Sequence, residues 1–229
     1  DKEPLVLNRY EAYIGVLIDD LITKGVDEPY RMFTSRAEHR ILLRQDNADV
    51  RLTEKSYQLG LAKEDRYRKF IEKQQKVDEI KSFFSDNYVY PDQINGLLER
   101  NGSTPIDQKL KLSYILLRPQ LSLKDLIDTL PTLEIYKSGN RFLNECLEEA
   151  EIQIKYDSYI QKENELAEKL ARLENVRLPK DFDFHTIQSL SYESREKLNR
   201  YHPETLGQAS RISGISPADI NVLAIFLGR

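Results

Sequence analysis

Apolar side chains recur every three or four positions along most of this chain, which is the spacing of amphipathic α-helices. The first such stripe, in the segment RYEAYIGVLIDDLITKG, consists of Tyr13, Ile14, Leu17, Ile18 and Leu21. Gly25 would end this helix, because glycine accepts the left-handed conformation that often follows a last helical turn. Further helices are expected over 63–84, 91–99, 106–117, 122–130, 141–173 and 191–200.

The end of the chain contains residues that typically start or interrupt short helices. Pro203 would open one helix, Gly214 would interrupt it, and Pro217 stands where the first residue of another would be. Only the letters LVL near Leu5 suggest a strand. The expected fold class is mostly α: a multi-helix region with a small terminal helical subdomain and, at most, a short strand near the N-terminus. Its segments are expected to be 1–60, 61–151 and 152–229.

Composition narrows the class of protein. Hydrophobic residues make up 40% of the 229, enough to bury a core, and a net charge of -4 gives no global attraction for nucleic acid. The single cysteine, Cys146, excludes an internal disulfide framework and is expected to be a small buried side chain. No signal peptide or membrane-spanning run is visible, so a cytoplasmic location is expected. Because Met32 is the only methionine, we expect a fragment of a longer protein.

The sequence shows no active site of its own. It has no GxGxxG motif, no P-loop and no CxxC pair, so neither a dinucleotide cradle nor a metal site is expected. The histidines His39, His185 and His202 are far apart and lack metal-ligand spacing.

One segment gathers arginines in an otherwise acidic chain. Within EPYRMFTSRAEHRILLRQDNAD the fourteen positions 31–44 hold Arg31, Arg36, Arg40 and Arg44, and Arg51 follows. If Thr34-Ser35 caps a helix over 37–44, three of these arginines lie on one side along about 12 Å. Guanidinium groups so spaced suit two adjacent phosphates. The alternative is that they pair with Glu38, Asp46 and Asp49 or with carboxylates elsewhere in the fold; Asp46 and Asp49 belong to a turn.

Two further stretches suggest contacts with nucleic acid or with a partner. In TLGQASRISGISPADINVL, two short helices joined at Gly214 resemble a helix-hairpin-helix, whose second helix would offer free N–H groups to a phosphate. In KYDSYIQKE, Tyr156 and Tyr159 share a helix side with Lys155 beside them, and aromatic rings between cations can stack on bases. The alternatives are that the glycine serves packing and that the tyrosines belong to a core or interface.

Three motifs together resemble the MnmG (GidA) family of flavoproteins that modify the tRNA wobble uridine. They are DDLITKGVDEPYRMFTSRAEHRILLRQDNADVRLTEKSYQLGL, KYDSYI and PETLGQASRISGISPADINVL, in the order of that family. The resemblance implies that the intact protein binds FAD, uses NADH, and works with the GTPase MnmE on tRNA as a homodimer. Together they would attach a carboxymethylaminomethyl or aminomethyl group to C5 of the uridine, with methylene-tetrahydrofolate as the one-carbon source.

The resemblance also assigns roles within the chain. The flavin-binding glycines and catalytic cysteines of the family would precede Asp1, so no catalytic residue and no cofactor are expected here, and segment 1–60 would pack on the flavin domain. The residues expected to contact tRNA are Arg31, Arg36, Arg40, Arg44, Arg51, Lys155 and Arg211. The residues expected to contact the partner are Tyr156, Tyr159, Gln208, Arg211 and Gly214.

Two hypotheses therefore stand. In the first, the chain is a binding region for tRNA and MnmE; in the second, it is a dimerisation and GTPase-docking scaffold with its arginines in internal ion pairs. The chain departs from the family pattern at Lys162-Glu163, where Arg-Gln is usual, and at Tyr201-His202, where an arginine often precedes the proline. His39 replaces a common tyrosine and is expected to matter little.

Overall fold

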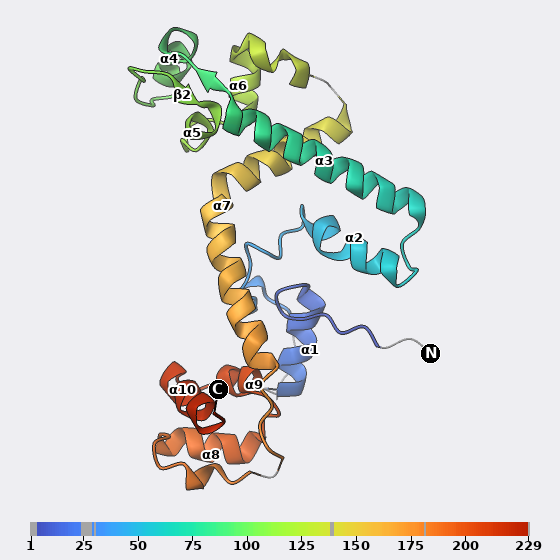
Figure 1. Cartoon of the computed structure of the whole chain (residues 1–229), viewed down its shortest axis with the longest axis vertical. Coiled ribbons are helices and arrows are strands. Elements are labelled where there is room, and N and C mark those ends of the chain that lie inside the picture. The colour runs from blue at the N-terminus through green and yellow to red at the C-terminus, as the bar shows by residue number, and fades with distance from the viewer. Residues whose placement is uncertain (1–3, 24–28, 30, 138–139, 181, 229) are drawn as a thin grey trace. The chain divides into compact units, whose positions relative to one another are not determined.

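The computed structural model describes residues 4–23, 29, 31–137, 140–180 and 182–228 (Figure 1). Gly25, the expected end of the first helix, lies outside them. The described residues are mostly helical, as the sequence predicts, and the chain forms two compact units: residues 44–160 make one, and residues 1–43 together with 161–229 make the other.

The unit of residues 44–160 is built on the long helix α3. Its elements are α2 (Ala48–Gln58), α3 (Glu64–Asp86), β1 (Tyr88–Val89), α4 (Pro91–Arg100), β2 (Leu110–Lys111), α5 (Leu112–Leu116), α6 (Leu123–Thr129), η2 (Pro131–Tyr136) and the first part of α7 (Arg141–Glu174). The short elements gather on the last turns of α3, where Val77, Ile80 and Phe84 are fully buried (Figure 1). Their partners in this core include Ile94, Leu98, Ile115, Leu116, Leu126, Leu133 and Cys146.

The other unit is held by two smaller cores. It contains α1 (Tyr13–Thr23), η1 (Thr34–Arg36), the last part of α7, η3 (Phe184–Thr186), α8 (Tyr192–Tyr201), α9 (Leu206–Arg211) and α10 (Pro217–Phe226). One core joins Val16, Ala37 and Leu43. The other lies among the last short helices and includes Phe184, Leu198, Leu206, Ile212 and Leu223.

The buried face of helix α1 is not the face that carries most of its apolar side chains. Val16 and Asp20 are buried, as is Ala12 just before the helix, while Ile14 and Ile18 of the predicted stripe remain half exposed. A buried carboxylate such as that of Asp20 is costly unless a cation pairs with it. The residue that supplies this cation is the centre of the site described below.

Most long helices and their caps agree with the sequence prediction. Helices α3, α4, α6, α7 and α8 match the expected ranges with small shifts at their ends. Ser122 and Ser191 cap α6 and α8 by accepting the N–H groups of Asp125 and Ser194. Pro217 is the first residue of α10, and Gly214 has the positive φ of +92° expected of a tight connection.

The helix predicted over 37–44 is wrong. Residues 34–36 form the short 3-10 helix η1 with Phe33 as its cap, Ala37 is extended (φ -90°, ψ 116°), and turns follow to Leu42. Ala37 and His39 are both buried, and a helix would point side chains two positions apart in nearly opposite directions. The carbonyl of Arg36 accepts from the Arg9 guanidinium instead of a helical N–H.

Three other local predictions also fail. Segment 106–117 holds a strand before its helix: Asn95 binds both the N–H and the carbonyl of Ile106, β2 pairs with β1, and helix begins only at Leu112. Thr205, not Pro203, starts α9, because its hydroxyl accepts the N–H of Gln208. The letters LVL near Leu5 form no strand in the described residues.

Candidate nucleic-acid interface

The centre of the site is Arg9, which lies just before α1 and is only 10% exposed. Its Nη1 donates to Asp19 at 2.9 Å and to Asp20 at 2.7 Å, and its Nη2 donates to Glu38 at 2.7 Å. It also reaches the carbonyls of Val16 and Arg36. Burial alone would lower the pKa of Arg9, but the hydrogen bonds and charges of Glu38 and Asp20 outweigh it and raise that pKa. Arg9 therefore fastens α1 to the arginine-rich segment.

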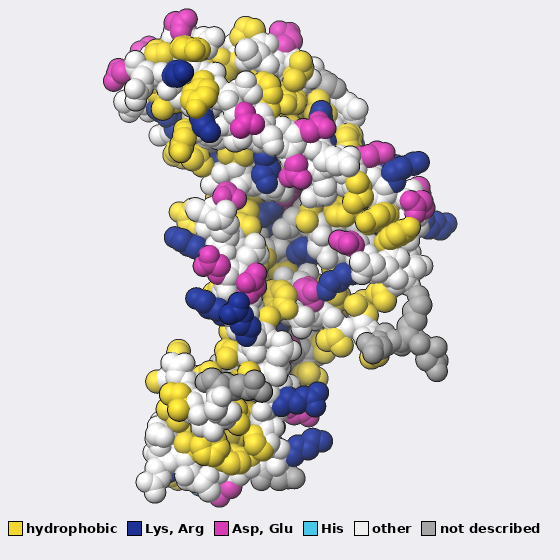
Figure 2. Space-filling view, in the orientation of Figure 1, with side chains coloured by type: hydrophobic (Ala, Val, Ile, Leu, Met, Phe, Trp, Pro, Cys, Tyr) yellow, Lys and Arg dark blue, Asp and Glu magenta, His cyan; other side chains and the backbone are white. Residues whose placement is uncertain are grey.

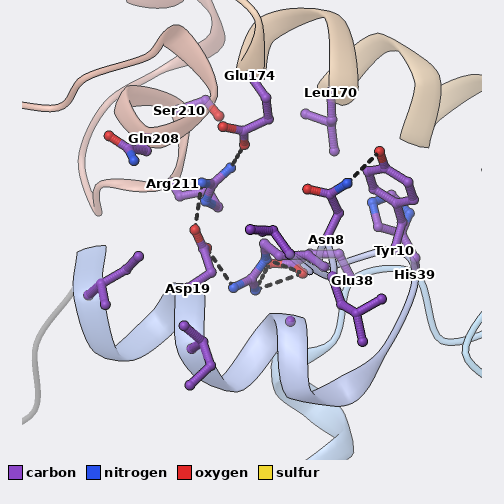
Figure 3. A pocket seen from close by; sticks show the side chains of 16 residues that line it. Asn8, Tyr10, Asp19, Glu38, His39, Leu170, Glu174, Gln208, Ser210 and Arg211 are labelled. Atoms are coloured by element: carbon purple, nitrogen blue, oxygen red, sulfur yellow. Dashed lines mark hydrogen bonds and ion pairs between the residues drawn. The ribbon is translucent and has the colours of Figure 1, made fainter. Parts of the chain in front are cut away.

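A second arginine extends this network to the last short helices, α8, α9 and α10, which are called the C-terminal bundle below. Arg211 of α9 donates to Glu174 at the end of α7, and its Nη2 donates to Asp19 at 2.7 Å (Figure 3). Glu174 also accepts from the Thr205 hydroxyl at 3.1 Å. Gly207 makes room for this carboxylate, because a Cβ there would lie 2.3 Å from the Glu174 Cδ.

The two arginines line a pocket of about 570 Å³ (Figure 3). Its charged wall consists of Arg9, Asp19, Glu38, Glu174 and Arg211, and its apolar wall includes Val6, Ile18, Ile22 and Leu170. Both guanidinium groups already pair with carboxylates. Neither of these two guanidinium groups is left unpaired for a pyrophosphate, so the described lining of this pocket does not fit FAD or another dinucleotide.

The arginines of the predicted cluster divide into two kinds. Arg31 and Arg40 are exposed, as is Arg36, whose side chain keeps 43% of its surface and has the buried carboxylate of Asp20 at 3.9 Å. Arg31 lies over the ring of Phe33 at 5.2 Å. Among the described residues, Arg40 makes no ion pair. These three cations belong to the unit that contains Arg9.

Arg44 and Arg51 belong to the other unit and serve its internal structure. Arg44 donates to Asp46 at 2.9 Å and to Glu149 at 3.3 Å, and its side chain is 18% exposed. Arg51 donates to the Arg44 carbonyl at 2.9 Å and to the Asn47 side chain at 3.0 Å. Asp46 and Asn47 precede α2, and Asp49 lies in its first turn, where it pairs with Lys73.

The lysine of the KYDSYI motif is also engaged. Lys155 donates to the Leu121 carbonyl at 2.6 Å and pairs with Glu151 at 2.8 Å. Glu151 in turn accepts the N–H of Leu123 at the start of α6. Tyr156 and Tyr159 are exposed, at 47% and 62%, with ring centroids 6.4 Å apart. The motif thus joins a structural lysine to two solvent-facing rings.

The predicted hairpin of the C-terminal bundle has no vacant helix start. Ser216 and Asp219 cap α10 reciprocally, so a carboxylate already occupies the place where a phosphate was expected. Gly214 packs against Glu193 and Lys197, whose Nζ lies 2.2 Å from where a Cβ would be. The Gln208 side chain accepts the N–H of Glu204 at 2.7 Å. The positive φ of Gly214 and these close side chains both favour glycine at this position.

Asp219 joins the caps of two helices, and this makes a test possible. Its Oδ1 also accepts the N–H of Ser191, the cap of α8, at 3.2 Å. Burial would raise the pKa of Asp219, but the hydrogen bonds from Ser216 and Ser191 lower it. Because the folded pKa lies below the unfolded one, the stabilisation is complete above the unfolded value and disappears as pH falls through the folded value.

We therefore expect Asp219→Ala to cost about 1–2 kcal/mol at neutral pH. The difference from the parent should stay constant down to about pH 5 and shrink below about pH 4. Thermal unfolding followed by circular dichroism across this range measures it, with Asp219→Asn as the variant that keeps an acceptor. A difference that does not change with pH would show that the carboxylate charge contributes nothing.

Other candidate groups are structural. Cys146 is fully buried, and burial raises the pKa of its thiol. His39, expected to matter little, is 2% exposed and places Nδ1 2.7 Å from Oε1 of Glu163, so it ties the arginine-rich segment to α7. No cluster of three metal-binding side chains occurs in the described ranges. Within those same ranges, no helix is both long and apolar enough to cross a membrane.

Comparison with known proteins agrees with this helical arrangement. Residues 64–164 match the family model described as "tRNA modifying enzyme MnmG/GidA C-terminal helical domain", and residues 166–229 match the one described as "tRNA modifying enzyme MnmG/GidA C-terminal helical bundle". The chain is 56% identical over 229 residues to the tRNA uridine 5-carboxymethylaminomethyl modification enzyme MnmG of Parabacteroides distasonis and 52% identical to that of Christiangramia forsetii. These matches cover 99% and 100% of this chain but 37% of either relative.

A solved structure shows the same fold. Aquifex aeolicus GidA in its form II crystal is 38% identical with a TM-score of 0.72, covering 100% of this chain and 35% of that one. The matched regions thus define the class: a helical C-terminal domain followed by a helical bundle, as found in tRNA modifying enzymes. The chain belongs to the MnmG/GidA family.

Proposed function

We propose that this chain is the C-terminal binding region of an enzyme that attaches a carboxymethylaminomethyl or aminomethyl group to C5 of the tRNA wobble uridine. In the longer protein, FAD would bind mainly outside the residues of this chain and NADH would be the reductant, with methylene-tetrahydrofolate as one-carbon source. The protein would act in the cytoplasm as a homodimer with the GTPase MnmE. This chain would contribute contacts to tRNA and to that GTPase, and no catalytic group.

The observation that carries the tRNA contact is the exposure of Arg40, which has no ion pair among the described residues, beside the exposed Arg36. The network around Arg9 holds the backbone from which they project, since Arg9 binds the Arg36 carbonyl and the neighbouring Glu38. Exposed guanidinium groups on a fixed backbone suit phosphate oxygens, because little backbone freedom remains to be lost on binding.

Replacing Arg36 and Arg40 together with alanine in the full-length protein should therefore weaken tRNA binding by about tenfold or more at low salt. The slope of log affinity against log salt should fall by roughly two, one for each lost phosphate contact. Fluorescence anisotropy with labelled tRNA at several salt concentrations measures both. Arg68→Ala with Arg141→Ala is the matched control, because these arginines are 70% and 92% exposed and, among the residues that the structure describes, each pairs within its own helix.

The second candidate is a scaffold that docks the GTPase and makes no tRNA contact. It is favoured by the internal pairing of Arg44, Arg211 and Lys155. It predicts that the Arg36/Arg40 double variant binds tRNA as tightly as the control. It also predicts that Tyr159→Ala, which removes an exposed ring, weakens capture of the full-length protein by immobilised MnmE. Both results together would replace the first proposal with the second.

A further inference from the structure

The two-stranded ribbon of β1 and β2 sorts its side chains onto two faces. Tyr88 lies opposite Lys111 and Val89 lies opposite Leu110 in an antiparallel register. Side chains two apart on a strand share a face, and the backbone stays extended through Tyr90 (φ -102°, ψ 158°). Tyr88, Tyr90, Lys109 and Lys111 therefore project from the outer face, and we call these four residues the Tyr–Lys face.

The inner face of the ribbon fixes this arrangement. Val89 is 1% exposed and belongs to the core of its unit, and Leu110 packs against the same core. A shift of one residue in the pairing would turn Val89 outward and the tyrosines inward. The register is therefore set by the core. The side chains of the outer face are held on that face by this register and not by their own contacts.

The outer face leaves two aromatic rings in solvent. Tyr88 and Tyr90 are 48% and 50% exposed. Successive positions on one face of a strand are about 6.7 Å apart. The two rings are thus close enough for consecutive bases of one strand.

The lysines of this face are not neutralised. In the described part of the chain, neither Lys109 nor Lys111 has a carboxylate within ion-pair distance. Both lie near the Tyr88 ring instead, with Nζ 5.1 Å from the ring centroid for Lys109 and 6.0 Å for Lys111. The space-filling view shows dark blue side chains among yellow ones over the part of the 44–160 unit that carries α4, β2 and α5 (Figure 2). Rings and uncompensated positive charge are therefore combined on one small surface.

We propose that the Tyr–Lys face binds unpaired nucleotides of an RNA, with bases stacked on Tyr88 and Tyr90 and phosphates paired with Lys109 and Lys111. The inference rests on the proposed function in taking tRNA as that RNA, and it adds a contact separate from Arg36 and Arg40. Aromatic rings accept any base by stacking, while lysine side chains follow the backbone, which is the usual pattern of single-strand recognition.

The two lysines lying near the Tyr88 ring do not block such a base. An exposed cation–π contact is weaker than the stacking of a base on an aromatic ring. A base therefore displaces the ammonium groups, which move on their flexible stems to phosphates. A protein partner would instead have to bury two lysines, a residue type depleted from protein interfaces.

The test uses the full-length protein with two fluorescent RNAs, the whole tRNA and a short unstructured oligouridylate. Tyr88→Ala should weaken oligouridylate binding roughly fivefold or more, and Tyr88→Phe, which keeps the ring, should restore it. Lys109→Gln with Lys111→Gln should lower the salt slope for the oligouridylate by about 1.4. Tyr192→Ala is the matched control, because Tyr192 is 71% exposed and also lies by a cation, Arg195, at 6.0 Å.

The outcomes separate this inference from the proposed function. If the parent does not bind tRNA, the proposed function fails. If the parent binds tRNA with the expected loss in the Arg36/Arg40 variant, but Tyr88→Ala matches Tyr192→Ala on both RNAs, only the Tyr–Lys face is wrong. If Tyr88→Ala instead dissociates a dimer in size-exclusion chromatography while RNA affinity is unchanged, the face joins two protein copies and the proposal is overturned. Unchanged circular dichroism of each variant confirms that folding is intact.

Discussion

Arg9→Ala is expected to lower the melting temperature by roughly 6–20 °C, which corresponds to a loss of about 3–5 kcal/mol. Arg9 neutralises Asp20, whose side chain is 1% exposed, and also binds Asp19 and Glu38. Removing the arginine takes away the ion pair that Asp20 makes at 2.7 Å, while the guanidinium of Arg36 lies farther off, at 3.9 Å. Breaking a buried ion pair by removing one member costs far more than an exposed ion pair contributes.

Thermal unfolding followed by circular dichroism tests this, with Arg141→Ala as control because Arg141 is 92% exposed in its pair with Glu145. The control should change stability by no more than about 0.5 kcal/mol. Combining Arg9→Met with Asp20→Asn should recover a large part of the loss, since the buried charge is removed along with its partner. An Arg9→Ala protein that melts with the control would mean that water reaches these carboxylates.

Arg44→Ala is expected to produce the second large loss, about 2–4 kcal/mol, in the unit of residues 44–160. Arg44 is the cation beside Asp46 and Glu149, and Glu149 is only 3% exposed. Burial raises the pKa of Glu149 while Arg44 opposes that rise, and the pKa of Asp46 is lowered, against its own burial, by the hydrogen bond from Arg44. Without the guanidinium, Glu149 must stay buried as an anion that has lost its ion pair with Arg44, or take up a proton.

The pH dependence of this loss follows from the same shifts. A carboxyl group whose folded pKa exceeds its unfolded value destabilises the fold when ionised, and the penalty is relieved as pH falls through the folded pKa. The cost of Arg44→Ala should therefore be larger at pH 7 than at pH 5, which urea unfolding at both values measures. Adding Glu149→Gln should remove most of the cost and its pH dependence. If the loss of unfolding free energy is equal at both pH values, or persists in the double variant, it does not arise from the charge of Glu149.

The parts of the fold that the sequence predicts are those fixed by local chemistry. Helix α3 follows from its periodic apolar residues, and the starts of α6, α8 and α10 follow from Ser122, Ser191 and Pro217. The segment over 37–44 has helix-forming residues but is held by distant groups, namely Arg9 at the Arg36 carbonyl and Glu163 at His39. Strand β2 is two residues long, which is too short to show an alternating pattern.

Of the candidate site, only the exposed arginines could be predicted from the sequence. The cluster of Arg31, Arg36 and Arg40 is visible in the sequence because its members are neighbours, and they are exposed in the structure. Arg9 was missed, since its partners Asp20 and Glu38 stand 11 and 29 positions away and no local motif joins them. The Tyr–Lys face was missed for the same reason: Tyr88 and Lys111 meet only through strand pairing.

The shared dependence of Asp19, Asp20 and Glu38 on one guanidinium also has a consequence for evolution. A lineage that loses the arginine at position 9 would pass through an unstable intermediate unless Asp20 becomes neutral in nearly the same step. We expect natural sequences to keep the arginine and the aspartate together or to exchange both, so that drift at these two positions is correlated rather than independent.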